Sequence, residues 1–178
     1  MGSIKPGSAL VKLIPWDPES PSHVQRLYDQ RVACGWKEER VERWRELQRQ
    51  GKISLQWIVL AQPSPSLLTA HTTAYPSEST SLLDTPASFG GKPRIATNAE
   101  FLPVGHISLD SEYETAEHAE AEEGLYWIAT FYISTALQGS GLGRAAMDAV
   151  EAMATSEPLN ARVLGLSTVA KDGAGRKE

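Results

Sequence analysis

The sequence contains 178 residues, 41% of them hydrophobic and 22% charged, with a formal net charge of -5. This composition predicts a single globular domain over residues 1–178, and the acidic balance without a Lys or Arg cluster excludes nucleic acid as the main partner, because neutralising phosphates needs a basic surface. The single cysteine excludes an internal disulfide, and the lack of a signal peptide or of an apolar run long enough to span a bilayer predicts a cytoplasmic protein without a membrane partner.

Two strands and two helices are predicted in the first third of the chain. Residues 9–14 alternate in polarity and residues 53–61 are mainly apolar, which is typical of strands. Between them, Gly35 and Gly51 mark the ends of two helices. Apolar side chains at helical spacing define the faces that we expect to be buried: Val24, Leu27, Tyr28 and Val32 in the first helix, and Val41, Trp44 and Leu47 in the second.

The middle of the chain lacks a regular pattern. Residues 62–100 are rich in Pro, Ser, Thr and Gly, and we predict a flexible insertion between two strands, either a lid over a ligand or a solvated segment without a role. Residues 101–110 form the next predicted strand, in which His106 is expected to be a core or surface residue. The acidic connection 111–124 is interpreted as a solvated turn, with an electrostatic funnel for a cationic ligand as the alternative. The histidines are scattered without metal-ligand spacing, so no metal site is predicted.

The most informative segment follows, where an apolar run leads through a glycine-rich loop into a helix. Residues 125–133 carry no charge and are rich in aromatic and β-branched side chains, which predicts a strand buried on both faces. Glycines occupy positions 139, 141 and 143, and Leu142 begins a helical apolar pattern that continues to Met153. The free N–H groups and the dipole at a helix N-terminus favour an anion, so this loop is predicted to bind phosphate.

Three phosphate-binding motifs compete for this loop. A P-loop is excluded because Arg144 and Ala145 stand where Lys and Ser or Thr are required. The dinucleotide fingerprint fits Gly141, Gly143 and Ala146, but residues 134–138 separate the strand from the first glycine, where that motif needs a tight turn. The third pattern, Q/R-x-x-G-x-G/A, is met by Gln138 with Gly141 and Gly143. In this pattern the chain resembles the GCN5-related N-acetyltransferase (GNAT) superfamily.

The resemblance implies a fold, a cofactor and an activity. The fold is α/β, with a mixed, mostly antiparallel central sheet flanked by helices, and the cofactor is acetyl-CoA. Backbone groups of Phe131 and Ile133 would bond the pantetheine. The pyrophosphate would be held by the loop residues Gln138, Gly139, Ser140, Gly141, Leu142, Gly143 and Arg144. The implied activity moves an acetyl group to a primary amine of a small molecule or a peptide, and a non-catalytic acyl-CoA-binding module is the alternative.

The catalytic side chains stay unassigned. By resemblance, a backbone N–H near Ile133 would polarise the thioester carbonyl, and the loop between the first two helices would border the acceptor, where Trp36 and Trp44 could shape the pocket. Core packing is the favoured interpretation of both tryptophans. Family members that use a carboxylate base place it near residues 126–128, which contain none here, so Glu123, Asp110 or a water relay remain as alternatives.

The end of the chain departs from the family pattern. Residues 163–169 form the last predicted strand, where the family continues with a helix, often carrying a Tyr that protonates the leaving thiol, and two more strands. Only residues 171–178 follow here. An uncovered edge strand needs a partner, and we expect a homodimer; a truncated natural form or coverage by residues 62–100 are the alternatives.

Overall fold

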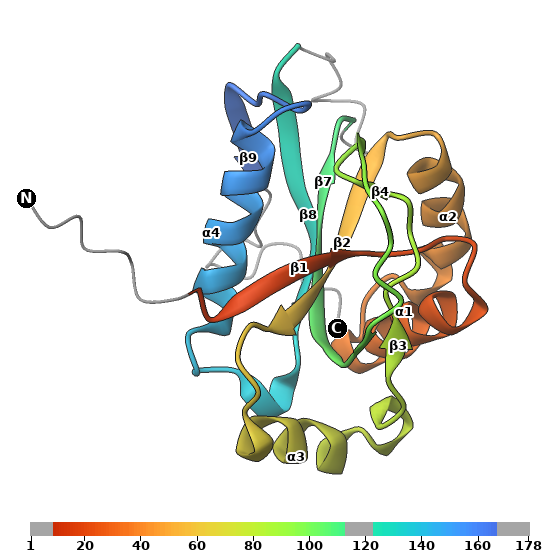
Figure 1. Cartoon of the computed structure of the whole chain (residues 1–178), viewed down its shortest axis with the longest axis vertical. Coiled ribbons are helices and arrows are strands. Elements are labelled where there is room, and N and C mark those ends of the chain that lie inside the picture. Colours follow the sequence, from red (N-terminus) through yellow and green to blue (C-terminus); the bar gives the residue numbers. More distant parts are fainter. Residues whose placement is uncertain (1–8, 113–122, 167–178) are drawn as a thin grey trace, which may run out of the picture.

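A five-stranded sheet forms the centre of the molecule (Figure 1). The computed structural model describes residues 9–112 and 123–166. The strands run in the order β1-β2-β7-β8-β9, and all neighbours are antiparallel except β8 and β9, which are parallel. Their bounds are Val11–Pro15 for β1, Ile53–Leu60 for β2, Pro103–Asp110 for β7, Leu125–Ile133 for β8 and Val163–Leu166 for β9. The mixed, mostly antiparallel sheet predicted from the sequence is confirmed.

Helices cover both faces of this sheet. On one face lie α1 (Pro21–Cys34), the short 3-10 helix η1 (Glu38–Arg40) and α2 (Val41–Arg49); on the other lies α4 (Leu142–Thr155). The alternation of β2 separates two apolar clusters, because Leu55 and Trp57 pack under α1 and α2 whereas Ile58 packs under α4. We refer to these two sides as the α1 face and the α4 face.

Helix α1 is bounded by clear capping residues but buries a different face from the predicted one. Ser20 accepts a hydrogen bond from the His23 backbone N–H at 3.4 Å, and Gly35 ends the helix in the left-handed conformation. Tyr28 and Val32, predicted to be buried, are 44% and 51% exposed. The side chains that α1 buries instead, together with Leu27, are His23, Arg26, Gln30 and Arg31. The prediction is wrong at these positions because the polar side chains find hydrogen-bond partners inside the protein.

Residues 62–100 contain a helix that the sequence does not predict. Helix α3 (Pro65–Ala74) is followed by the 3-10 helix η2 (Pro76–Glu78), and α3 packs against η4 (Thr135–Leu137), the turn that follows β8. Two small antiparallel pairs complete the segment: β3 (Leu82–Leu83) with β6 (Glu100–Phe101), and β4 (Ser88–Phe89) with β5 (Lys92–Pro93).

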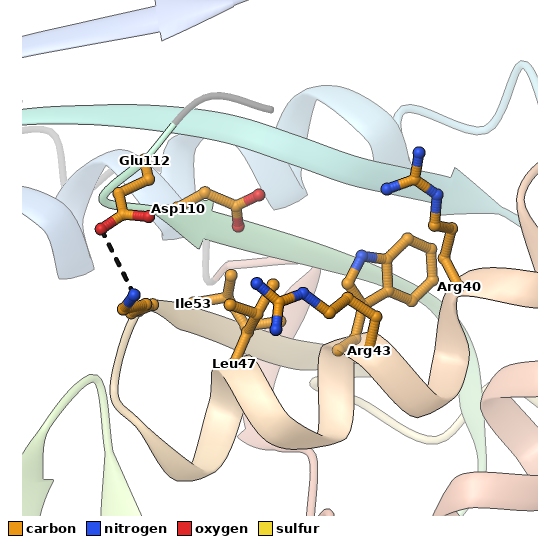
Figure 2. A pocket seen from close by; sticks show the side chains of 8 residues that line it. Arg40, Arg43, Leu47, Ile53, Asp110 and Glu112 are labelled. Atoms are coloured by element: carbon orange, nitrogen blue, oxygen red, sulfur yellow. Dashed lines mark ion pairs between the residues drawn. The ribbon is translucent and has the colours of Figure 1, made fainter. Parts of the chain in front are cut away.

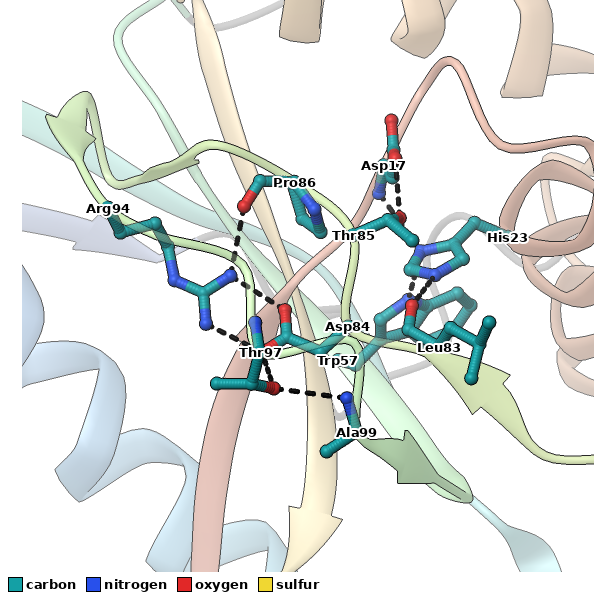
Figure 3. Close-up of polar contacts among 10 residues, drawn as sticks. All are labelled: Asp17, His23, Trp57, Leu83, Asp84, Thr85, Pro86, Arg94, Thr97 and Ala99. Carbon is teal, nitrogen blue, oxygen red and sulfur yellow. Dashed lines mark hydrogen bonds and ion pairs between the residues drawn. The ribbon is translucent and has the colours of Figure 1, made fainter.

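Polar contacts tie this segment to the α1 side of the molecule (Figure 3). Within the segment, Arg94 donates to both carboxylate oxygens of Asp84, at 2.6 and 2.7 Å, and this guanidinium lowers the pKa of Asp84 to about 2. His23 donates from Nε2 to the Leu83 carbonyl at 2.7 Å while its Nδ1 accepts from the Trp57 indole at 3.1 Å. The segment is therefore held by specific bonds to residues far away in the sequence.

Three further expectations concern the tryptophans, the sheet edge and the membrane. Trp44 is buried, as expected for the core, whereas Trp36 is 54% exposed. Strand β9 stands last in the strand order and is described to Leu166. Residues 113–122 and 167–178 lie outside the described residues. The homodimer expected from the sequence therefore stays a prediction. None of the described helices combines the length and apolar character needed to cross a lipid bilayer.

Candidate active site

The glycine-rich loop joins the end of β8 to the start of α4. The loop folds back on itself, because Gln138 donates from its side chain to the Ile133 carbonyl at 3.3 Å and the Ser140 hydroxyl donates to the Leu137 carbonyl. Gly139 and Gly141 both have φ of +84°, a conformation in which L side chains are strained. Gly141 is the N-cap of α4, which has neither a side-chain cap nor an acidic residue in its first turn. Its first amides are therefore available to an anion.

A cavity of about 360 Å³ lies between this loop and the end of β8. Six of the sequence-predicted residues line it: Phe131, Ile133, Gln138, Gly139, Leu142 and Gly143. The phenyl ring of Phe131 lies against the loop, since a Cβ added at Gly143 would be 3.7 Å from its Cζ. The structure thus brings together most of the residues predicted to contact the cofactor.

The remaining predicted residues lie outside the cavity lining, and three lining residues were missed. Ser140 is turned back toward Leu137, Gly141 lies at the N-cap of α4, and Arg144 is exposed. The missed lining residues are Cys34, Tyr132 and Leu137. Cys34 ends α1, so its proximity depends on tertiary packing and has no local sequence signal.

Strand β8 contains a β-bulge beside the cavity. Ala129 pairs with Ser108 and Tyr132 pairs with His106, so two residues, Thr130 and Phe131, stand opposite one residue of β7. Thr130 has φ of +46°, an unusual and strained value for a β-branched residue. Strain of this kind is commonly retained at functional sites.

The bulge follows the last described pair between β8 and β9. The described pairs of β8 with β9 run from Leu125 opposite Val163 to Ile128 opposite Leu166, two residues before the bulge. On the other side, β7 approaches closely: a Cβ at Gly105 would lie 2.1 Å from the Tyr132 carbonyl oxygen. The end of β8 therefore lies close against β7, and Phe131, Tyr132 and Ile133 line the cavity.

A chain of buried polar side chains supports the start of the loop from the α1 face. The His71 ring, on α3, is hydrogen-bonded through Nδ1 to the Ser134 hydroxyl at 2.8 Å, and its Nε2 lies 3.4 Å from Glu78. Gln30 of α1 donates to the same Glu78 oxygen at 2.7 Å. His71, Glu78, Gln30 and Ser134 are all at most 1% exposed. Helix α3 thus positions the residue that directly follows β8.

The chain continues to His106 on β7. The His106 ring donates from Nδ1 to the Gln30 side-chain oxygen at 2.8 Å, and its Nε2 accepts from Arg31 at 3.3 Å. Burial, and secondly the neighbouring Arg31 charge, hold the pKa of His106 well below 6.5, so the ring is neutral. Its core position confirms the sequence interpretation and argues against a role as a base at the cavity.

Tyr132 is the cavity-lining residue with a buried hydroxyl. Its ring lies 5.5 Å from that of His106, and its oxygen is buried without a hydrogen-bond partner that meets geometric criteria among the described residues. Burial, and secondly the neighbouring Tyr75, raise the pKa of Tyr132. The phenol is therefore protonated at neutral pH and is a donor rather than a base.

The two carboxylates suggested from the sequence lie away from the bulge. Asp110 ends β7 and pairs with Trp127, and its Oδ1 accepts from the Ser108 hydroxyl at 2.8 Å. Trp127 precedes Thr130 by three residues, which is about 10 Å along a strand. Glu123 precedes β8 and is exposed. Neither carboxylate lines the cavity beside the loop.

Comparison with known proteins gives a family. The model of the acetyltransferase (GNAT) family matches residues 54–175. No curated protein matches the chain by sequence. Similar solved structures include an acetyltransferase from Trypanosoma brucei, with 15% identity, coverage of 94% of this chain and 93% of that chain, and a TM-score of 0.42.

Two further similar structures cover most of the chain. A predicted acetyltransferase with acetyl-CoA from Clostridium acetobutylicum shares 9% identity over 94% of this chain and 90% of that chain, with a TM-score of 0.47. NAA60 from Arabidopsis thaliana, in complex with a bisubstrate analogue, shares 13% identity over 92% and 78%, also with a TM-score of 0.47. Because these scores are low, the assignment rests on the family model, which matches more than half of the sequence. The chain belongs to the acetyltransferase (GNAT) family.

Proposed function

We propose that the protein binds acetyl-CoA in the cavity beside the glycine-rich loop and transfers the acetyl group to a primary amine of a small molecule or a peptide. The observation that carries the proposal is continuity: one cavity is lined both by the end of β8 and by the glycine-rich loop that leads to the uncapped start of α4. An anionic head and an extended chain with amide groups are what such a surface would bind.

The residues present fit this cofactor. The first amides of α4 and the backbone of Gly139 and Gly141 would hold the pyrophosphate, and the edge of Phe131 and Ile133 would bond the pantetheine. When bound, acetyl-CoA supplies an activated thioester. The bulge at Thr130 and Phe131 turns main-chain groups away from the regular ladder, and an N–H at this point would polarise a carbonyl without depending on any side chain.

Proton transfer has no side chain assigned to it. Because Asp110 lies about 10 Å along the sheet from the bulge, it is too far to take a proton directly from an amine held there. A water relay is consistent with that distance. Tyr132 lines the cavity, but its hydroxyl is buried beside Tyr75 and is not assigned a role.

Calorimetric titration with acetyl-CoA tests the cofactor proposal. Replacing Gly141 with Asp introduces a side chain and a negative charge at the pyrophosphate position, and we expect affinity to fall by about 100-fold or more, equivalent to about 3 kcal/mol. Gly51→Asp is a matched control, because Gly51 also has positive φ, +70°, and has open space where a side chain would stand. Equal affinity in both variants would refute binding at this loop.

Thiol release over a panel of amines tests the transfer step. Turnover with any amine well above solvent hydrolysis would establish an enzyme. Tight acetyl-CoA binding with no turnover for any amine would instead favour the acyl-CoA-binding module.

A further inference from the structure

Helix α3 is attached to the rest of the protein mainly through η4, the turn that follows β8 (Figure 1). The structure describes all of α3, and His71 is its only buried residue. Leu67 and Leu68 are partly buried and pack against the apolar cluster of the α4 face. A short helix that buries so little is not stable by itself, so the bonds made by its side chains decide where it docks.

Two side-chain hydrogen bonds join α3 and the turn. His71 Nδ1 is bonded to the Ser134 hydroxyl at 2.8 Å, and the Tyr75 hydroxyl is bonded to that of Thr135. On the other side of the His71 ring, Nε2 lies 3.4 Å from Glu78 Oε1. This oxygen favours a proton on Nε2, which leaves Nδ1 as the acceptor. The Ser134 hydroxyl is therefore the donor in its bond to His71.

Ser134 is held from three directions. Its backbone N–H donates to the Val104 carbonyl of β7 at 2.8 Å, and its carbonyl accepts from the Leu137 N–H at 2.9 Å. Its hydroxyl is bonded to His71. Ile133 before it and Leu137 after it both line the cavity beside the glycine-rich loop. The direction in which the chain leaves β8 and enters that loop is therefore set in part by a residue of α3.

The residues that follow α3 are anchored to α1. Gln30 donates to Glu78 at 2.7 Å, and Arg26 donates to the Thr80 carbonyl. The side chains of Gln30, Arg26 and Glu78 are all buried. Helix α3 and η2 together thus connect α1 with the turn that precedes the glycine-rich loop. We call these two helices, residues 65–78, the α3 brace.

We propose that the α3 brace controls the affinity of the loop for acetyl-CoA, with His71 as a positioning residue that acts through Ser134. The inference rests on the proposed function, because it concerns the same site. None of the brace residues lines the cavity, so the effect is exerted through the turn. Docking of the brace and binding of the cofactor both fix this turn, and each therefore strengthens the other by the same factor.

Two replacements of His71 test the proposal. In His71→Asn the amide stands near the position of Nδ1 and can keep the bond to Ser134, whereas in His71→Gln it reaches the position of Nε2 and keeps only the contact with Glu78. We expect the calorimetric affinity for acetyl-CoA to change by less than about 2-fold in His71→Asn and to fall by about 10-fold in His71→Gln, the scale of one hydrogen bond. A purely structural role would lower the affinity in both, in proportion to their loss of stability in urea.

A change on the other side of the bond keeps the test independent of how His71 variants fold. Ser134→Ala should also lower the affinity by about 10-fold, and its effect should not add to that of His71→Gln, because both break the same bond. Thr72→Ala is the matched control, since the Thr72 hydroxyl bonds within α3, to the carbonyls of Leu68 and Thr69. Control-like affinity in Ser134→Ala and His71→Gln, or additive losses, would overturn the proposal.

Hydrogen exchange separates this inference from the proposed function. Saturating acetyl-CoA should slow exchange of the amides of residues 66–78 by about 10-fold, although none of them contacts the cofactor. Binding without this protection would refute the coupling and leave the proposed function in place. If the parent binds no acetyl-CoA, the proposed function is refuted, and the free proteins decide on the brace. Faster exchange over residues 134–143 in His71→Gln than in Thr72→Ala would retain it, and equal exchange would refute it.

Discussion

The two faces of the sheet are held together by different interactions. On the α4 face, apolar side chains such as Ile107 and Val104 pack against Ala146 and Val150, and all four are fully buried. On the α1 face, fully buried aromatic and aliphatic side chains are joined by polar ones, among them His106 and Gln30 with its partner Glu78. Both faces remove apolar area from water, but the α1 face in addition buries polar groups that need hydrogen-bond partners inside the protein.

The difference matters because the polar chain on the α1 face ends at the candidate active site. Through His71 it reaches Ser134, the residue that links β8 to the glycine-rich loop. Hydrogen bonds are directional, so they fix side-chain positions more closely than apolar contacts do. The two faces should therefore be sensitive to opposite substitutions: polar to apolar on the α1 face, and apolar to polar on the α4 face.

Replacing Gln30 with Leu should have the largest effect. The change leaves the His106 Nδ1–H without its acceptor and removes a donor from Glu78, and we expect the free energy of unfolding in urea to fall by about 3 kcal/mol. Gln25→Leu, on the exposed side of α1, is the control and should change it by less than about 0.5 kcal/mol. Similar losses for both would mean that the buried network contributes little.

On the α4 face, the corresponding test replaces an apolar side chain with a polar one. Val104→Thr keeps the shape of a fully buried side chain but places a hydroxyl in the apolar cluster, and we expect a loss of about 2 kcal/mol from its desolvation. Val163→Thr, at a position that is 53% exposed, should be nearly neutral. If Val104→Thr were equally neutral, the α4 face would not be the apolar environment described above.

Stability should also depend on pH through a residue of the α1 face, and this effect should be smaller than those of the two substitutions above. His106 has a pKa well below 6.5 because it is buried next to Arg31. As the pH falls through about 6.5, the unfolded chain takes up a proton there and the folded protein does not, so stability falls. We expect a loss on the order of 1 kcal/mol from His106 between about pH 7 and pH 5.5, measured by urea unfolding. The loss should be smaller in His106→Gln but not absent, because burial also lowers the pKa of His23. Parallel loss in the parent and the variant would place the titrating group elsewhere.

The same contrast explains what could be predicted from the sequence. The apolar stripe of α4 and the strand before it depend on local periodicity, so residues 125–153 were placed correctly. The α1 face was predicted wrongly at Tyr28 and Val32, because Arg26 and Gln30 are buried only through partners such as Thr80 and Glu78, far away in the sequence. Periodicity carries no information about such distant partners.

The candidate active site also has one part that the sequence predicts and another that it does not. The Gln138, Gly141 and Gly143 pattern located the loop, because backbone conformation there restricts residue type. The bulge at Thr130 had no such signal, since threonine is an ordinary strand residue and its positive φ follows from the pairing of β7 with β8. The cavity of about 300 Å³ beside α2 (Figure 2) was also missed, because Arg43 and Asp110, which line it, come to the same region only when α2 packs on the sheet.

Gly139 and Gly141, the two loop glycines in the left-handed conformation, restrict the handedness of the residue at these positions more than the size of its side chain. At Gly139 no atom lies within 4 Å of where a Cβ would stand, and at Gly141 the nearest is Leu10 Cδ1 at an ordinary 3.7 Å. Space therefore does not exclude a side chain at either position; the positive φ does, because it is unfavourable for L-amino acids. A D-alanine introduced by chemical synthesis would adopt this φ without that strain. What these positions select is the chirality of the residue, and glycine is the genetically encoded residue that has none.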